Sequence, residues 1–230
     1  MTKHIGIVAV SAEGAALCYR TICAEGAQLL GRHMHPEVSM HTFPLGEYMR
    51  CIETGSWNKV ADLMLASARK LAGCGADFLI CPDNTAHQAM DLVVPQSPRP
   101  WLHIAAEVAR DAASRGFKRV GVLGTRYLME APVYPSKLAA QTIEHEIPHR
   151  QERERINQII FDDLVYGRFE PEARSYFTQM ISNLRARGCD AVALACTEIP
   201  LLIAESDSSL PILDSTRILA RAALREATST

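Results

Sequence analysis

The sequence lacks the usual motifs of nucleotide binding, secretion and membrane insertion. No GxGxxG run follows the first apolar segment and no Walker A motif occurs, so nothing indicates a nucleotide site. No apolar stretch approaches the roughly 20 residues of a membrane span. The start MTKHIGIVAV is too short and too lightly basic for a secretory signal. Because the net charge is only -2, we expect neither nucleic acid nor a membrane as a partner.

Signals for disulfides, metals and cofactors are also missing. The seven cysteines are odd in number and contain no CxxC pair, which indicates a reducing cytoplasm and mostly buried thiols. His33 and His35 form an HxH pair without a third ligand in spacing, so no metal site is expected. None of the five lysines lies in a recognisable pyridoxal-phosphate context. We therefore predict a protein with no metal and no bound cofactor.

The chain does contain short apolar runs that alternate with longer amphipathic segments. The runs that predict strands are residues 5–10, 38–43, 77–82, 119–125 and 190–196. The segments that predict helices are residues 12–30, 57–73, 104–115, 151–166 and 171–187. This alternation predicts an α/β fold with buried and mostly parallel strands.

An internal repeat divides this pattern into two similar halves. HIGIVAV (4–10) resembles RVGVLGT (119–125), and GADFLICPD (75–83) resembles GCDAVALAC (188–196). We therefore predict two pseudo-symmetric Rossmann-like α/β domains. The first comprises residues 1–100 with 214–230 and the second comprises residues 101–213. The proline-rich segment QSPRP (96–100) is the predicted crossover between them.

The repeat makes Asp83 and Cys196 equivalent. Each follows the glycine that opens its segment by eight residues and precedes a polar pair, Asn84-Thr85 or Thr197-Glu198. Open parallel sheets bind ligands at the carboxyl ends of their strands. The helix N-termini that follow would offer backbone N–H groups to a substrate carboxylate. If the halves face each other, these two residues lie on either side of one site.

Further motifs at characteristic spacing are NTAH (84–87), LGT (123–125) followed by Met129 and Tyr134, INQIIFDDLVYGRF (156–169), CTEI (196–199) and LPILDST (210–216). With these motifs, nearly the whole chain resembles the cofactor-independent aspartate/glutamate (Asp/Glu/hydantoin) racemases, most closely the bacterial amino-acid racemases. The resemblance implies a site in the interdomain cleft, a small carboxylic acid as substrate, and a homodimer.

The resemblance also implies two acid/base residues that flank the substrate Cα, usually both cysteines. Cys196 matches the second family cysteine, whereas the first falls at Asp83, where some relatives carry threonine. Cys81 lies two residues earlier and is a weaker substitute, although alternation along a strand could point it to the same side. The chain further departs from the family in the turn AVSAEGAA (9–16) and at Leu128 and Leu219.

Each acid/base candidate also has a plain structural interpretation. Cys196 is a catalytic thiol that a helix N-terminus makes easier to ionise, or a small buried residue. Asp83 is the facing acid/base, or the N-cap of a helix that begins at Asn84. Glu198 orients another group in the site, or is a solvated first-turn carboxylate. His87 lines the cleft or is structural.

The other candidates would bind the substrate carboxylate. Hydroxyl and amide side chains that can also cap turns are Ser11, Asn84, Thr85, Thr125 and Thr197, and Glu198 is grouped with them. Arg50 is expected in a loop, where it pairs bidentately with a carboxylate or lies solvated on the surface.

These residues predict a cytoplasmic isomerase, a cofactor-independent racemase or epimerase of a small aspartate- or glutamate-like amino acid. Cys196 and Asp83 would face each other across the substrate. One alternative is one-sided proton chemistry with a single cysteine, as in a decarboxylase or isomerase of a small carboxylic acid. Another is a ligand-binding relative without turnover.

Overall fold

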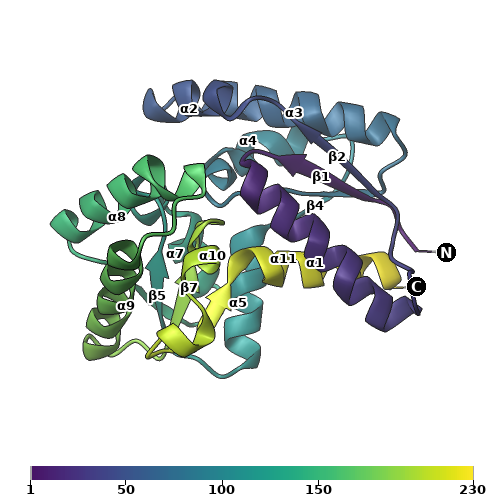
Figure 1. The fold of residues 1–230 in the computed structure, drawn as a ribbon. Coiled ribbons are helices and arrows are strands. Elements are labelled where there is room, and N and C mark those ends of the chain that lie inside the picture. The colour runs from purple at the N-terminus through teal and green to yellow at the C-terminus, as the bar shows by residue number, and fades with distance from the viewer. Residues whose placement is uncertain (1, 230) are drawn as a thin grey trace. The chain divides into compact units, whose positions relative to one another are not determined.

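The computed structural model describes residues 2–229, which form two compact units (Figure 1). The first contains the chain up to Ile104 and from Thr216 onward, and the second contains Ala105–Ser215. Each unit is built on a four-stranded parallel sheet, which confirms the predicted fold class. None of the helices in the described part combines the length and hydrophobicity that crossing a membrane requires.

The first unit has the strand order β2-β1-β3-β4. The strands are β1 (Ile5–Ala9), β2 (Val38–Thr42), β3 (Phe78–Ile80) and β4 (Trp101–Leu102). The helical segments are α1 (Ala12–Leu30), α2 (Leu45–Glu53), α3 (Trp57–Gly73), η1 (Thr85–Ala89), α4 (Met90–Val93), η2 (Val94–Gln96) and α11 (Ser215–Thr228). Helices α1 and α11 lie side by side (Figure 1). Their Ile22 and Ala223 join Ile5 and Ile7 of β1 in one apolar cluster.

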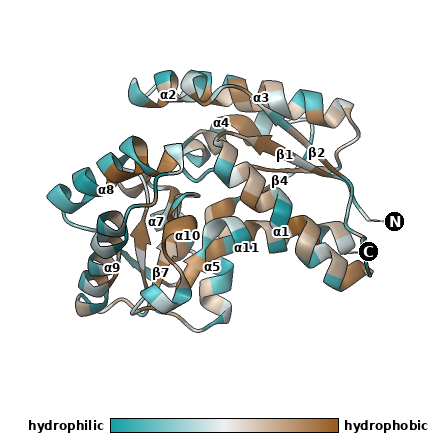
Figure 2. Ribbon diagram, in the orientation of Figure 1, coloured by the Kyte–Doolittle hydropathy of each residue, from teal (hydrophilic) through white to brown (hydrophobic). Residues whose placement is uncertain are grey.

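The second unit has the equivalent order β6-β5-β7-β8. The strands are β5 (Arg119–Leu123), β6 (Glu144–Glu146), β7 (Ala191–Leu194) and β8 (Ile212–Asp214). The helical segments are α5 (Ile104–Ser114), α6 (Arg126–Met129), α7 (Val133–Ala139), α8 (Arg150–Asp162), η3 (Leu164–Tyr166), α9 (Pro171–Ala186), α10 (Ile199–Leu202) and η4 (Glu205–Asp207). Amphipathic helices such as α8 carry hydrophilic and hydrophobic residues (Figure 2), as expected for helices that cover a sheet.

The repeat extends to the details of how the third strand of each sheet begins. Gly75 and Gly188 end the preceding helices α3 and α9 with φ of +94° and +88°, a conformation that glycine adopts at little cost. Two residues later, Asp77 accepts a hydrogen bond of 2.7 Å from the backbone N–H that precedes β1. Asp190 likewise accepts one of 3.1 Å from the backbone N–H at the start of β5. Equivalent residues therefore build equivalent turns in the two units.

Several boundaries differ from the sequence prediction. Arg50 lies in helix α2, not in a loop, because Tyr48 and Ile52 form a buried face one turn apart. The segment 96–100 leads into β4, which pairs with β3 in the first unit, so it is not the crossover. The helix predicted over 151–166 ends at Asp162 and is followed by η3, since Asp163 has non-helical φ and ψ of -123° and -61°.

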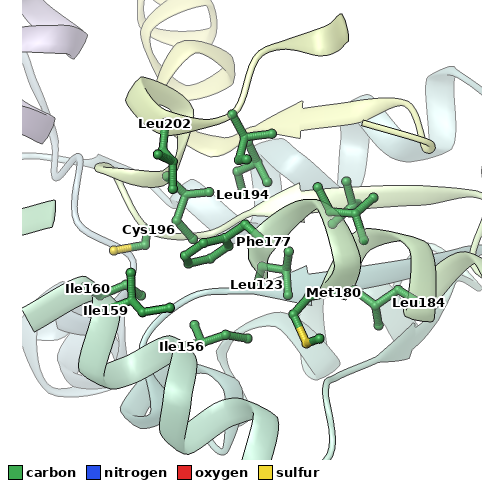
Figure 3. Close-up of a cluster of buried hydrophobic side chains, with 14 of the residues drawn as sticks. Leu123, Ile156, Ile159, Ile160, Phe177, Met180, Leu184, Leu194, Cys196 and Leu202 are labelled. Carbon is green, nitrogen blue, oxygen red and sulfur yellow. The ribbon is translucent and has the colours of Figure 1, made fainter. Parts of the chain in front are cut away.

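Phe177 lies in the core of the second unit, so replacing it should strongly lower the free energy of unfolding. This ring is fully buried and belongs to the apolar cluster that includes Leu123, Ile156 and Leu184 (Figure 3). Phe177→Ala is expected to lower the free energy of unfolding by about 3–5 kcal/mol, because it removes apolar contact and leaves a cavity. Urea denaturation measures this loss. The same change at Phe169, which is 36% exposed, is the control and should cost less than about 1 kcal/mol; equal losses would contradict the assignment of the core.

Candidate active site

Asp83 and Cys196 occupy the same place in the two sheets. Strands β3 and β7 pair in the same register with β1 and β5, so that Leu79 and Val192 each lie opposite the glycine of the repeat. Asp83 and Cys196 each lie four residues further on, beyond the carboxyl end of the strand. The candidate residues of each unit therefore gather at the edge where parallel sheets bind ligands.

Cys196 forms a compact polar group with the two residues that follow it. Its Sγ donates a hydrogen bond to Glu198 Oε2 at 3.0 Å, and the Thr197 hydroxyl donates to the same oxygen at 2.8 Å. Glu198 is only 3% exposed, so its interpretation as a solvated carboxylate is wrong. A carboxylate held against a thiol can accept its proton and leave a thiolate, which is the reactive form of cysteine.

Cys196 lies where the apolar core of the second unit ends. Its side chain belongs to the cluster that includes Ile160 and Leu202, and its sulfur points away from Phe177 (Figure 3). The following helix α10 is a single turn that begins at Ile199. The hydrogen bond to Glu198 is therefore a more specific influence on the thiol than a helix dipole.

Asp83 caps the turn that follows it. Its Oδ1 accepts the backbone N–H of Ala86 at 2.8 Å, and the turn η1 begins at Thr85 instead of Asn84. This contact is of the capping type that aspartate often makes. The contact accounts for the Oδ1 atom, and the acid/base role of Asp83 stays a prediction.

His87 has a structural role in fixing this turn. Its Nδ1 bonds to the Asp83 carbonyl at 2.7 Å, and its Nε2 bonds to the Ile104 backbone N–H at 3.2 Å. A carbonyl only accepts and an N–H only donates, so the bonding places the single ring proton on Nδ1. His87 thereby connects the Asp83 turn to the start of α5.

Cys81 does not replace the missing thiol. It is fully buried, and burial, followed by the charge of Asp83, raises the pKa of this thiol well above its usual value. Sequence reasoning also missed Tyr48, which α2 buries in the same region. Burial, followed by the charges of Cys81 and Asp83, raises the pKa of this phenol. Only the amphipathic pattern of α2 could have indicated this residue.

The remaining candidates fall into three groups. Ser11 Oγ accepts from Gly14 N–H at 3.3 Å and Thr125 Oγ1 accepts from Leu128 N–H at 3.2 Å, so both are helix N-caps. Asn84 and Thr85 are buried in the turn after Asp83. Arg50 is exposed and lines a hollow of about 360 Å³ together with acidic and basic side chains of α2 and α3.

A second hollow lies at the carboxyl edge of the first sheet, beside the turn at residues 9–16 where the sequence departs from the family. Its volume is about 590 Å³, and its walls are residues 9–12, 15 and 16 on one side and residues 40 and 42–45 on the other. Ser11 is the one candidate that lines it. Within residues 2–229, no group of three or more His, Cys, Asp or Glu side chains is placed to hold a metal ion.

Comparison with known proteins decides the family. The model of the Asp/Glu/hydantoin racemase family matches residues 5–223. The chain belongs to this family. The broad specificity amino-acid racemase RacX of Bacillus subtilis is 25% identical over 189 residues, which cover 81% of this chain and 80% of RacX.

Solved structures of this racemase family share the fold over the whole chain. A structure from Yersinia pestis described as an Asp/Glu racemase has 30% identity and a TM-score of 0.90, and covers 99% of this chain and 100% of its own. An aspartate racemase homologue from Pyrococcus horikoshii has 26% identity and a TM-score of 0.85, with 100% of both chains covered. The resemblance inferred from NTAH and CTEI is confirmed.

Proposed function

We propose that the chain is a cofactor-independent racemase or epimerase of a small amino acid, with Cys196 and Asp83 acting on opposite faces of the substrate Cα. The observation that carries the proposal is the thiol–carboxylate pair of Cys196 and Glu198 at 3.0 Å. Cys196 occupies in the second sheet the position that Asp83 occupies in the first. Racemases are isomerases, and RacX is described as a broad specificity amino-acid racemase.

The proposed reaction moves one proton off Cα and another one on. Glu198 accepts the thiol proton, the Cys196 thiolate removes the α-proton, and protonated Asp83 delivers a proton to the opposite face. Backbone N–H groups at the turns after β3 and β7 would stabilise the negative charge that develops on the substrate. In the reverse direction Asp83 is the base and the thiol is the acid.

Proton NMR in D2O with L- and D-amino acids tests this proposal directly. Loss of the α-proton signal together with formation of the opposite enantiomer is the expected result. A panel in which no amino acid exchanges its α-proton would overturn the racemase proposal.

One-sided proton chemistry is the second candidate, and the contact between Asp83 and Ala86 favours it. Only one of the two equivalent positions is a cysteine, and the carboxylate at the other already serves as a cap at 2.8 Å. A decarboxylase of a small malonate would need only one proton donor, which Cys196 supplies. Release of CO2 from substituted malonates, without inversion of any amino acid, would select this candidate.

Glu198→Gln tests the role of the thiol–carboxylate pair. Glutamine still accepts a hydrogen bond from Cys196 but does not take up its proton, so kcat should fall by about 100-fold. The rate of α-proton exchange measures this effect. Glu205→Gln removes an exposed carboxylate of the same unit and should leave kcat unchanged. A Glu198→Gln variant with the wild-type rate would show that Glu198 only fills space.

The proposal includes the assembly and setting that the sequence suggests. The domains would be the two units of the structure, the chain up to Ile104 with Thr216 onward, and Ala105–Ser215. The enzyme would be a cytoplasmic homodimer without a cofactor, acting on a small carboxylic acid. The oligomeric state is measurable by light scattering, and activity after exhaustive dialysis tests cofactor independence.

A further inference from the structure

We propose that the 590 Å³ hollow at the carboxyl edge of β1 and β2 binds an apolar side chain of the substrate, so that the chain prefers neutral, hydrophobic amino acids over aspartate and glutamate. The hollow has the size of a small-molecule site. The inference rests on the proposed racemase activity and names the class of its substrate.

The sheet register places this hollow beside Asp83. Ile7 of β1 pairs with Met40 of β2 on one side and with Ile80 of β3 on the other. Phe43, three residues after Met40, lies in the wall of the hollow. Asp83, three residues after Ile80, lies in the turn. Neighbouring strands lie about 5 Å apart, so the hollow begins about 5–10 Å from Asp83. The side chain of leucine, methionine or phenylalanine covers such a distance from a Cα held at Asp83.

The lining excludes a carboxylate. Among the described residues that form the walls, none is charged, and only Ser11 and Thr42 carry hydroxyl groups. The Ser11 oxygen already accepts the Gly14 N–H. A carboxylate placed there would lose its hydration without gaining a cation, which is costly. An apolar side chain would instead gain free energy from each methylene that leaves water.

Arg50, the cation that the sequence suggests as a carboxylate partner, does not line the apolar hollow. Arg50 lines the separate hollow with Glu47, Lys59 and Asp62. On the apolar side, Met40 is 49% exposed, although methionine is usually buried. A bound hydrophobic side chain would cover this surface. The lack of charge in the walls of the hollow and the exposure of Met40 therefore both favour a neutral, hydrophobic substrate.

The test compares α-proton exchange of leucine, methionine and phenylalanine with that of aspartate and glutamate. Leucine and aspartate are similar in shape, so their kcat/KM ratio isolates the effect of charge. We expect a ratio of about 100 or more in favour of leucine. Aspartate or glutamate as the fastest substrate would overturn the inference and leave the racemase proposal intact.

Ala16→Arg provides the matched variant. Ala16 is an exposed residue of α1 in the wall of the hollow, and arginine is a good helix former. The added cation should shift the leucine-to-aspartate ratio toward aspartate by about 10-fold or more. Ala16→Gln adds a polar side chain without charge and should keep the leucine preference. An unchanged ratio in Ala16→Arg would contradict the proposed site.

Thermal denaturation with the same amino acids separates binding from turnover. If no amino acid exchanges, the racemase proposal fails. Stabilisation by leucine and methionine that weakens in Ala16→Arg would still support an apolar ligand site. The absence of any such stabilisation, together with no exchange, would overturn both proposals.

Discussion

Replacing Cys196 by alanine is expected to lower kcat/KM for racemisation by about 10⁴-fold. The change removes the proposed base for one face of Cα and the acid for the reverse direction, and general acid–base catalysis contributes up to about this factor. Because the thiol donates a hydrogen bond to Glu198, the alanine variant also leaves that carboxylate without this donor. Loss of α-proton exchange in D2O measures the effect.

Two further variants separate the chemistry of the thiol from its place in the structure. Cys196→Ser keeps a donor for Glu198 but ionises with much more difficulty, so we expect a loss of about 100- to 1000-fold. Cys189→Ala is the control, because Cys189 is also buried but lies before the amino end of β7. Burial above all raises the pKa of its thiol to about 11. Wild-type activity in Cys196→Ala, or an equal loss in Cys189→Ala, would exclude the proposed role.

The parts of the fold that could be predicted are those whose sequence pattern reflects complete burial. Strands β1 and β7 are buried along their whole length and therefore read as continuous apolar runs. The edge strand β6 has the sequence Glu-His-Glu and is largely exposed, so no hydrophobic pattern indicates it. Its backbone hydrogen bonds to β5 define it instead.

The site was predictable as a pair of positions but not as a set of contacts. The repeat alone makes Asp83 and Cys196 equivalent. Both lie at the same spacing from the start of their strands, and the two strands pair in the same register. The burial of Glu198 depends on residues distant in sequence, so its first-turn position gives a misleading expectation of solvation. For Ser11 and Thr125, capping and ligand binding use the same hydroxyl, and only the structure identifies the bonds to Gly14 and Leu128.

Asp83→Asn is expected to separate the capping role from the acid/base role. Asparagine keeps an oxygen that accepts the Ala86 N–H, so the free energy of unfolding should change little, whereas Asp83→Ala should lose about 1 kcal/mol. Neither variant supplies a proton, so we expect racemisation to fall by about 1000-fold in both. Urea denaturation and NMR on the same samples compare the two effects.

The enantiomers should respond differently to Asp83→Asn. An amino acid that presents its α-proton to Cys196 should still exchange it for deuterium, with retention of configuration, because the thiolate and Glu198 are intact. The opposite enantiomer presents its α-proton to residue 83 and should not exchange. Inversion at the wild-type rate in Asp83→Asn would instead assign Asp83 to the cap alone. In that case a group other than residue 83 would have to protonate the face of Cα opposite Cys196, and the proposed pairing of Cys196 with Asp83 would be wrong.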